Sequence, residues 1–187
     1  MQIHVIRSAA RKKSLSLEIS PSGEVLVRAP LRASEAEIRK LIASHAAWIE
    51  ERLRRRAAEN AAAACLPPLT GTELRRLADD AAAYFPPLVS SWASALGVTC
   101  GRISIRNQKT RWGSCSAKGN LNFNCLLMLA PPEVRTYVVV HELCHRKEMN
   151  HSARFWQAVR TALPDYEKQR AWLREHGPAL LKRMQGG

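Results

Sequence analysis

The sequence has no apolar segment long enough to cross a membrane. Charged residues or prolines interrupt every apolar run before it reaches the roughly 18 residues that a transmembrane helix needs. A secretory signal is missing as well, because Arg7 and the basic residues 11–13 interrupt the apolar stretch that such a signal requires. We therefore expect a soluble, cytoplasmic protein with no membrane partner.

Disulfide and C-x-x-C patterns are also missing. The cysteines are odd in number, none forms a C-x-x-C pair, and the expected cytoplasmic compartment keeps thiols reduced. We expect free thiols at all five positions, which are Cys65, Cys100, Cys115, Cys125 and Cys144. A chain of 187 residues can bury a core of its own, so it needs neither disulfides nor a metal merely to fold.

Acidic residues are scarce. There are 16 Asp and Glu against 29 Lys and Arg, which gives a formal net charge of +13. Such an excess favours a polyanionic partner, a nucleic acid or a nucleotide, because clustered cations release counterions from phosphates. Arginine outnumbers lysine 21 to 8, however, a bias that a GC-rich coding sequence produces without selection for binding. The charge alone leaves polyanion binding open.

The N-terminal third predicts a small β-structure followed by a long helix. Three β-prone runs occur at 2–7, 14–20 and 23–29, and a turn at 21–23 joins the last two, so we expect an antiparallel β-meander. Ser34 and Glu37 form a capping box that begins a helix from about 35 to 60. Its alanine-rich tail is stopped by Pro67 and Pro68, which places a domain boundary between residues 1–66 and 67–187.

The second domain predicts helices around another small sheet. A helix begins at the Thr70–Glu73 capping box, is broken or kinked by Pro86-Pro87, and ends at Gly97. Runs at 102–106, 110–116 and 121–129 predict strands of an antiparallel sheet, with a hairpin turn at 118–120. Further helices are expected to begin at Pro132 and after Ser152, and a last one to extend to about 183. The fold class is α+β.

The stretch VVVHELCHRKEMNHSARFW has the spacing of a metal site. On a helix, residues i and i+4 lie on one face, so His141 and His145 can bring two imidazoles to one metal ion. Glu142 lies about 100° round the helix from His141. At that position it can reach a metal-bound water without entering the coordination sphere, which suits a general base.

His151 is the expected third ligand. If the helix ends near Asn150, the chain can turn back, because asparagine tolerates the left-handed conformation that such a turn needs. Three histidines leave one open position, as a catalytic zinc requires. The whole pattern arises by chance in about one such chain in a few thousand. It therefore predicts one zinc ion at His141, His145 and His151, with Glu142 as the catalytic residue.

Four segments resemble the YgjP-like metallopeptidase family and, more distantly, the SprT-like zinc proteases. They are TRWGSC (110–115), LNFN (121–124), YVVVHELCH (137–145) and NHSARFW (150–156). The N-terminal strands, Pro30 and Trp48 also fit the YgjP-like pattern, so the resemblance covers nearly the whole chain. It implies a zincin-like catalytic domain in which the same three histidines bind zinc and Glu142 is the catalytic glutamate.

The resemblance also suggests substrate contacts. In the YgjP-like family the strand with Arg111 and Trp112 lies near the metal cleft, so both are candidate contacts. Asn124 alternates with Asn122 on one strand face, where it can orient substrate or bond to a neighbouring loop. Phe155 and Trp156 follow the third histidine and are expected to anchor the next helix, with an aromatic floor beneath the metal as the alternative.

The predicted reaction is peptide hydrolysis, in which zinc-bound water activated by Glu142 attacks a peptide carbonyl. A peptide or protein substrate would lie extended along an exposed strand edge at residues 121–129. One alternative is a UTP-type nucleotide pyrophosphatase, an activity also attributed to the YgjP-like group, with Arg106, Arg111 or Arg146 neutralising the triphosphate. Another is a protease that acts on nucleic-acid-bound proteins, which the net charge permits.

Overall fold

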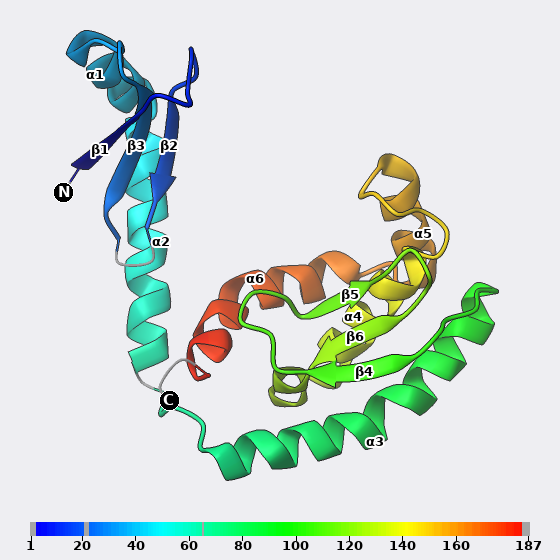
Figure 1. The fold of residues 1–187 in the computed structure, drawn as a ribbon. Coiled ribbons are helices and arrows are strands. Elements are labelled where there is room, and N and C mark those ends of the chain that lie inside the picture. The colour runs from blue at the N-terminus through cyan, green and yellow to red at the C-terminus, as the bar shows by residue number, and fades with distance from the viewer. Residues whose placement is uncertain (1–2, 21–22, 65, 185–187) are drawn as a thin grey trace. The chain divides into compact units, whose positions relative to one another are not determined.

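The computed structural model describes residues 3–20, 23–64 and 66–184 (Figure 1). The chain divides into two units, residues 1–62 and residues 63–187. None of the described helices is long and apolar enough to span a bilayer. The four described cysteines, Cys100, Cys115, Cys125 and Cys144, form no disulfide, whereas the prediction for Cys65 lies outside the described residues.

The first unit contains a three-stranded mixed sheet. Its strands are β1 (Ile3–Ser8), β2 (Ser16–Ile19) and β3 (Val25–Pro30), in the order β1-β3-β2. The predicted hairpin between β2 and β3 is present, but β1 runs parallel to β3, so the predicted antiparallel meander is wrong. Strand β3 lies in the centre of the sheet, and its alternate residues Val25, Val27 and Ala29 are fully buried. Every residue of the edge strand β1 is at least partly exposed, so the more apolar and more buried strand is the central one.

Two helices follow this sheet where one was predicted. Helix α1 (Glu35–Ser44) begins at the predicted capping box, and α2 (Ala46–Ala64) continues the chain. The backbone of His45, with φ −114° and ψ 14°, interrupts the helix between them. Ile38 of α1 packs against Val27 and Ala29 of β3, so an apolar contact fills the space between the helix and the sheet.

The second unit begins with α3 (Gly71–Leu96). Its capping box at Thr70 and Glu73 is confirmed, and Gly97 ends it in the left-handed conformation, with φ 65°. The predicted break at Pro86-Pro87 is absent, and the helix continues through both prolines. Phe85 and Val89, on either side of them, are fully buried, so packing holds both halves of the helix on the core.

A second mixed sheet lies against these helices. Its strands are β4 (Ile103–Arg106), β5 (Gly113–Cys115) and β6 (Leu121–Asn124), in the order β4-β6-β5. The β5–β6 hairpin confirms the predicted turn, with Gly119 at φ 81°, but β4 runs parallel to β6, so the sheet is not purely antiparallel. After Asn124 the chain forms the 3-10 helix η1 (Cys125–Leu129), because the Asn124 side chain accepts the backbone N–H of Leu126 and ends the strand early.

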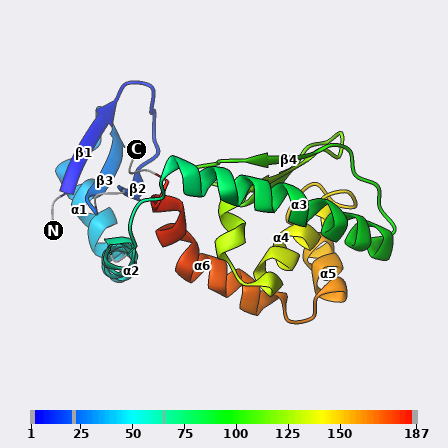
Figure 2. The same cartoon turned by 90° about the horizontal axis from the view of Figure 1, so that it is seen from below.

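Three helices complete the unit: α4 (Pro132–Cys144), α5 (Ala153–Ala162) and α6 (Tyr166–Lys182). Figures 1 and 2 show α4 in the middle, with α3, α5 and α6 around it. Val139 and Val140 of α4 are fully buried, and Phe85 of α3 stacks on Phe123 of β6 at 4.7 Å between ring centroids. The chain therefore places its predicted metal-binding helix in the core of the second unit.

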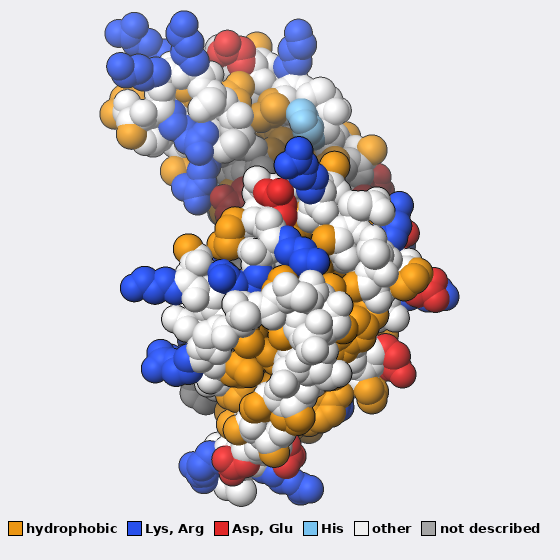
Figure 3. Space-filling view, turned by 90° about the vertical axis from the view of Figure 1, so that its right-hand side faces the viewer, with side chains coloured by type: hydrophobic (Ala, Val, Ile, Leu, Met, Phe, Trp, Pro, Cys, Tyr) orange, Lys and Arg blue, Asp and Glu red, His pale blue; other side chains and the backbone are white. Residues whose placement is uncertain are grey.

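One face of the molecule shows how basic and acidic side chains are distributed on it. On the face shown in Figure 3 the Lys and Arg side chains (blue) are spread over the surface, with acidic side chains (red) between them. The view therefore marks no continuous basic groove on that face, and polyanion binding stays a prediction.

Candidate metal centre

Helix α4 brings the first two histidines of the motif together. His141 lies in its last turn and His145 immediately follows it, with ring centroids 5.1 Å apart. The helix ends at Cys144 rather than near Asn150, because the N–H groups of Arg146 and Lys147 bond to carbonyls three residues back and tighten the chain into turns. This early end leaves six residues in which the chain can reverse direction.

The reversal places His151 opposite His141, and their Nε2 atoms are 3.0 Å apart. One ring nitrogen from each of the three histidines lies within 4.8 Å of the others. No described residue other than glycine has a positive φ, so the expected left-handed conformation at Asn150 is wrong. Because α4 ends early, the chain has enough residues to reverse direction without a left-handed residue. The Asn150 side chain accepts the N–H of Ser152, and Ser152 caps α5 as predicted.

The ring nitrogens have different partners. Nδ1 of His145 lies 3.1 Å from the carbonyl oxygen of Glu148, so this nitrogen carries the proton and Nε2 remains for a metal. Burial and the two neighbouring histidines lower the pKa of His141 to about 3, and burial also lowers the pKa of His145. Both rings are therefore neutral near pH 7, which is the form that binds metal ions.

This donor set fits a metal ion. The Nε2 atoms of His141 and His151 face each other, and two neutral imidazoles can share only one proton across such a contact. A cation between the rings would accept a lone pair from each of them and from Nε2 of His145, and imidazole is a common ligand for transition-metal ions.

An aromatic cluster supports the three rings. The Phe155 ring is fully buried and lies 4.5 to 4.8 Å from each of the three imidazole centroids. Trp156 stacks on His151 at 5.7 Å with an interplanar angle of 25°, and its other stacking partner is Tyr166 of α6 at 5.5 Å. Phe155 thus packs against all three imidazoles, while Trp156 lies between His151 and α6, so the anchoring role is confirmed for Trp156 and a floor beneath a metal stays a prediction.

Glu142 lies beneath strand β5. Its side chain is largely buried, and a Cβ atom added at Gly113 would lie 2.7 Å from Oε1 of the carboxyl group. Burial raises the pKa of Glu142 to about 8, an effect that the positive charge of Arg111 opposes. A carboxyl group with a raised pKa beside three converging histidines can accept and return a proton near neutral pH.

The three candidate substrate contacts have different surroundings. Arg111 is exposed, whereas Trp112 is half-buried and its ring lies against Gly177 of α6, leaving little space for a side chain there. Asn124 is fully buried, and its amide nitrogen donates to the carbonyls of Gln108 and Arg111. Of its two expected roles, Asn124 has the structural one, because it holds the loop that carries Arg111.

Arg146 and Arg106, two of the arginines predicted to neutralise a triphosphate, differ in their contacts. Arg146 donates to the carbonyl oxygens of Thr99 and Ala117, and it leaves no room for a side chain at Gly119. Its guanidinium therefore ties the end of α4 to the β5–β6 hairpin. Arg106 is exposed at the end of β4. Contact of either arginine with a triphosphate stays a prediction.

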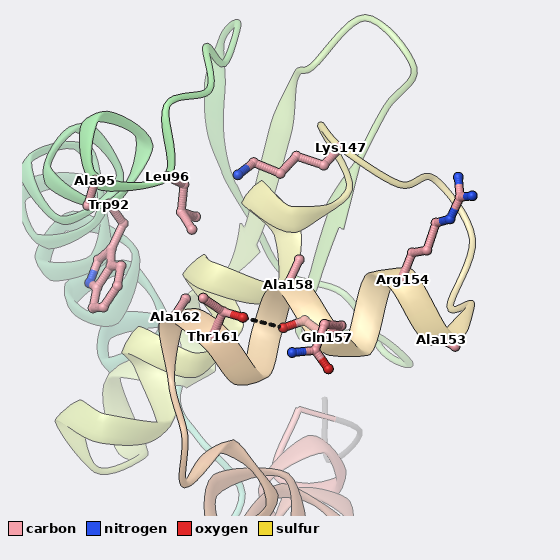
Figure 4. Close-up of a pocket in the computed structure, with 10 residues that line it drawn as sticks. All are labelled: Trp92, Ala95, Leu96, Lys147, Ala153, Arg154, Gln157, Ala158, Thr161 and Ala162. Carbon is pink, nitrogen blue, oxygen red and sulfur yellow. Dashed lines mark hydrogen bonds between the residues drawn. The ribbon is translucent and has the colours of Figure 1, made fainter.

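A hollow of about 760 Å³ lies between the end of α3 and the outer side of α5 (Figure 4). Trp92, Leu96 and Ala158 supply apolar lining, and the amine of Lys147 extends over the hollow. None of the predicted site residues lines it. The hollow is therefore distinct from the histidine cluster.

Two functional features were not anticipated from the sequence. Gly113 could have been found, since a glycine within a strand often marks the close approach of another group, here Glu142. Arg170 of α6 could not, because nothing in its local sequence indicates a metal site; its guanidinium carbon lies 4.5 Å from the centroid of the Trp156 ring.

Two solved structures resemble part of the chain. One is the metallopeptidase zymogen of Pyrococcus abyssi abylysin, with 22% identity, a TM-score of 0.44, and coverage of 53% of this chain and 93% of that one. The other is the metallopeptidase zymogen of Methanocaldococcus jannaschii jannalysin, with 24% identity, a TM-score of 0.41, and coverage of 47% and 89%.

The sequence comparisons are more informative. No curated protein matches the chain significantly. The model of the YgjP-like metallopeptidase domain matches residues 13–77 and 69–176, which together span most of the sequence and include Glu142 and all three histidines of the cluster. By this match, the chain belongs to the YgjP-like metallopeptidase family.

Proposed function

We propose that the protein is a zinc metallopeptidase whose zincin-like catalytic domain comprises residues 67–187. His141, His145 and His151 hold one zinc ion, and Glu142 is the general base. The observation that carries this proposal is the convergence of three histidine nitrogens within 4.8 Å, next in sequence to a buried glutamate. Zinc is favoured because it commonly takes three histidines and leaves an open position for chemistry.

The bound zinc would polarise the scissile carbonyl and lower the pKa of water at the site. Glu142 then accepts a proton at its carboxylate and delivers it to the departing amine. The raised pKa of Glu142 supports this role, because a base works best when its pKa is near the working pH, and Arg111 and a metal cation both counter the effect of burial. Phe155 and the capped start of α5 hold the imidazoles in place without taking part in proton transfer.

The substrate strand is β5 rather than residues 121–129. The edge predicted at 121–129 is wrong, because β6 pairs with β4 on one side and β5 on the other, and residues 125–129 are helical. Strand β5 pairs only with β6 among the described strands. Its backbone also approaches Glu142 at Gly113, so a peptide added along β5 would carry its carbonyl past the base.

The test combines metal analysis with a comparison of reactions. We expect one zinc per chain in the wild type and in Glu142→Gln, with hydrolysis of an unfolded protein reduced in the variant by roughly 10²- to 10⁴-fold. Full activity of Glu142→Gln would remove the base assignment. Release of pyrophosphate from UTP, without peptide cleavage, would instead support the nucleotide hydrolase.

A further inference from the structure

Two arginines flank the histidine cluster from different elements. Arg170 extends from α6 over the indole of Trp156, at 4.5 Å from the ring centroid. Trp156 in turn stacks on His151 and meets His141 edge-on at 5.8 Å. The Arg170 side chain is exposed, and its position over Trp156 places it one ring away from His151 and His141. This arginine therefore adds positive charge on the α6 side of the site.

Arg111 adds charge on the β5 side. It precedes β5 by two residues, and Asn124 fixes its backbone by donating to its carbonyl oxygen at 2.9 Å. Two residues further on, the backbone of Gly113 lies against the carboxyl group of Glu142, so the exposed Arg111 side chain starts beside the base. Arg111 is thus held near the base, as Arg170 is held near the third histidine.

Neither arginine forms an ion pair within the part of the chain that the structure describes. Other arginines do, among them Arg7 with Glu35, Arg28 with Glu18, and Arg160 with Glu167. Two unpaired cations beside a site for a metal cation repel that metal and each other. The charge of Glu142 alone does not balance two guanidinium groups and a metal cation, and negative charge on the substrate would add to the balance.

We infer that the enzyme prefers acidic peptides, with Asp or Glu side chains on both sides of the scissile bond. The inference rests on the proposed peptidase function and names its substrate class. Arg170 meets the acidic side chain on the α6 side, and Arg111 meets the one on the β5 side. Because one arginine lies over Trp156 beside His151 and the other just before Gly113 beside Glu142, they suit two separated charges along an extended chain better than one compact phosphate group.

Fluorogenic peptides that differ only in charge test this inference. One series carries Asp, Asn or Lys before the bond, and a second carries the same residues after it. We expect wild-type kcat/KM to be about 5- to 20-fold higher for Asp than for Asn in each series, and lower still for Lys, with the preference shrinking in high salt. Equal rates for the three residues, or a preference for Lys, would overturn the inference.

Variants assign each preference to its arginine. Arg170→Gln should reduce the Asp-to-Asn ratio to about 2 or less in one series, and Arg111→Gln in the other. Arg170→Glu should reverse the preference in its series towards Lys. The control is Arg76→Gln, an equal charge change at an exposed residue in the first part of α3. Figures 1 and 2 show that α3 begins at its end away from α5. It should leave both ratios unchanged.

Three measurements keep the outcomes distinct. Melting temperature and zinc content must match the wild type in each arginine variant, so that a changed ratio reports substrate charge rather than folding. Unchanged ratios in both Arg170→Gln and Arg111→Gln would overturn the inference while leaving peptide cleavage and its dependence on Glu142 in place. UTP hydrolysis that is lost in both variants, without charge-dependent peptide cleavage, would show that the arginines serve a nucleotide and would also overturn it.

Discussion

The two sheets of the protein share one topology but differ in what lies against them. In each, the first and third strands run parallel and the second forms a hairpin with the third, giving the orders β1-β3-β2 and β4-β6-β5. In the first unit, helix α1 presents Ile38 to Val27 and Ala29 of the sheet. In the second, helix α4 presents Glu142 to Gly113 of the edge strand.

This difference shows which features place ionisable side chains beside a small mixed sheet. Strand order alone does not place them there, since both sheets have the same order. In the second unit a buried helix brings an ionisable side chain under the edge strand, and the turn after that helix returns His151 to the same place.

Histidines of the two units should respond differently to removal. His145→Ala deletes one nitrogen of the cluster, so we expect zinc to be lost and peptide hydrolysis to fall by on the order of 10³-fold. Nδ1 of His45 in the first unit lies within hydrogen-bond distance of Leu41 and Ser44, which are its neighbours on α1. His45→Ala should therefore keep both the zinc content and the hydrolysis rate. The zinc content per chain and the rate of peptide hydrolysis are measured for both variants. Full zinc content in His145→Ala would contradict the proposed ligand set.

A methyl group at Gly113 should disturb catalysis without removing any functional group. The added Cβ would lie 2.7 Å from Oε1 and 2.9 Å from Cγ of Glu142, so the carboxyl group must move. We expect kcat for peptide hydrolysis to fall by roughly 10- to 100-fold in Gly113→Ala. Gly71→Ala is the control, because its nearest neighbour there is Arg75 at 3.8 Å. Equal kcat values for the two variants would show that β5 does not constrain the base.

Glu142 should make the stability of the metal-free protein depend on pH. Its pKa is about 8 when folded and about 4.5 when unfolded. The stabilisation from its bound proton is therefore complete below pH 4.5 and is lost as the pH rises through 8. Gln cannot ionise, so Glu142→Gln should be more stable than the wild type by roughly 1–3 kcal/mol at pH 7–8 and equal to it at pH 4.

Urea unfolding of the chelated wild type and Glu142→Gln at pH 4, 6 and 8 measures this stability difference. The difference in unfolding free energy between the two proteins at each pH removes the contributions of the other titrating groups, including His141. A stability difference that stays constant from pH 4 to 8 would show that Glu142 is not forced into its neutral form by burial.

The smallest expected effects come from the helix caps. Ser34→Ala in the first unit and Thr70→Ala in the second each remove a side chain that accepts the N–H of the residue three positions on. Each should destabilise its own helix by about 1 kcal/mol. Hydrogen exchange should show faster exchange in α1 for the first variant and in α3 for the second. If Ser34→Ala loosened α3 as well, the two units would not be independent.

The features that the sequence predicted correctly depend on neighbours within a few residues. Ser34 with Glu37 and Thr70 with Glu73 form capping boxes, and Gly119 makes the hairpin turn, because these contacts close within one turn of chain. The spacing of His141, His145 and His151 likewise predicted a histidine cluster, which the structure assembles.

The wrong strand pairings and the absent helix break concern contacts between distant segments. Alternating apolar residues indicate which face of a strand is buried, but they do not say which strand is its neighbour, so the parallel pairs β1–β3 and β4–β6 were missed. The break expected at Pro86-Pro87 reflects local geometry, which the buried residues on either side override.

The sequence by itself determined the ionisable groups, their order and the helix that carries them, because those depend on spacing along one element. The tertiary structure decided the environment of these groups. It buried Glu142 beneath Gly113, engaged Arg146 with the hairpin, and placed Arg170 of α6 over Trp156 of α5. These contacts join residues that are 14 to 47 positions apart, and only packing of the whole unit around α4 brings such residues together.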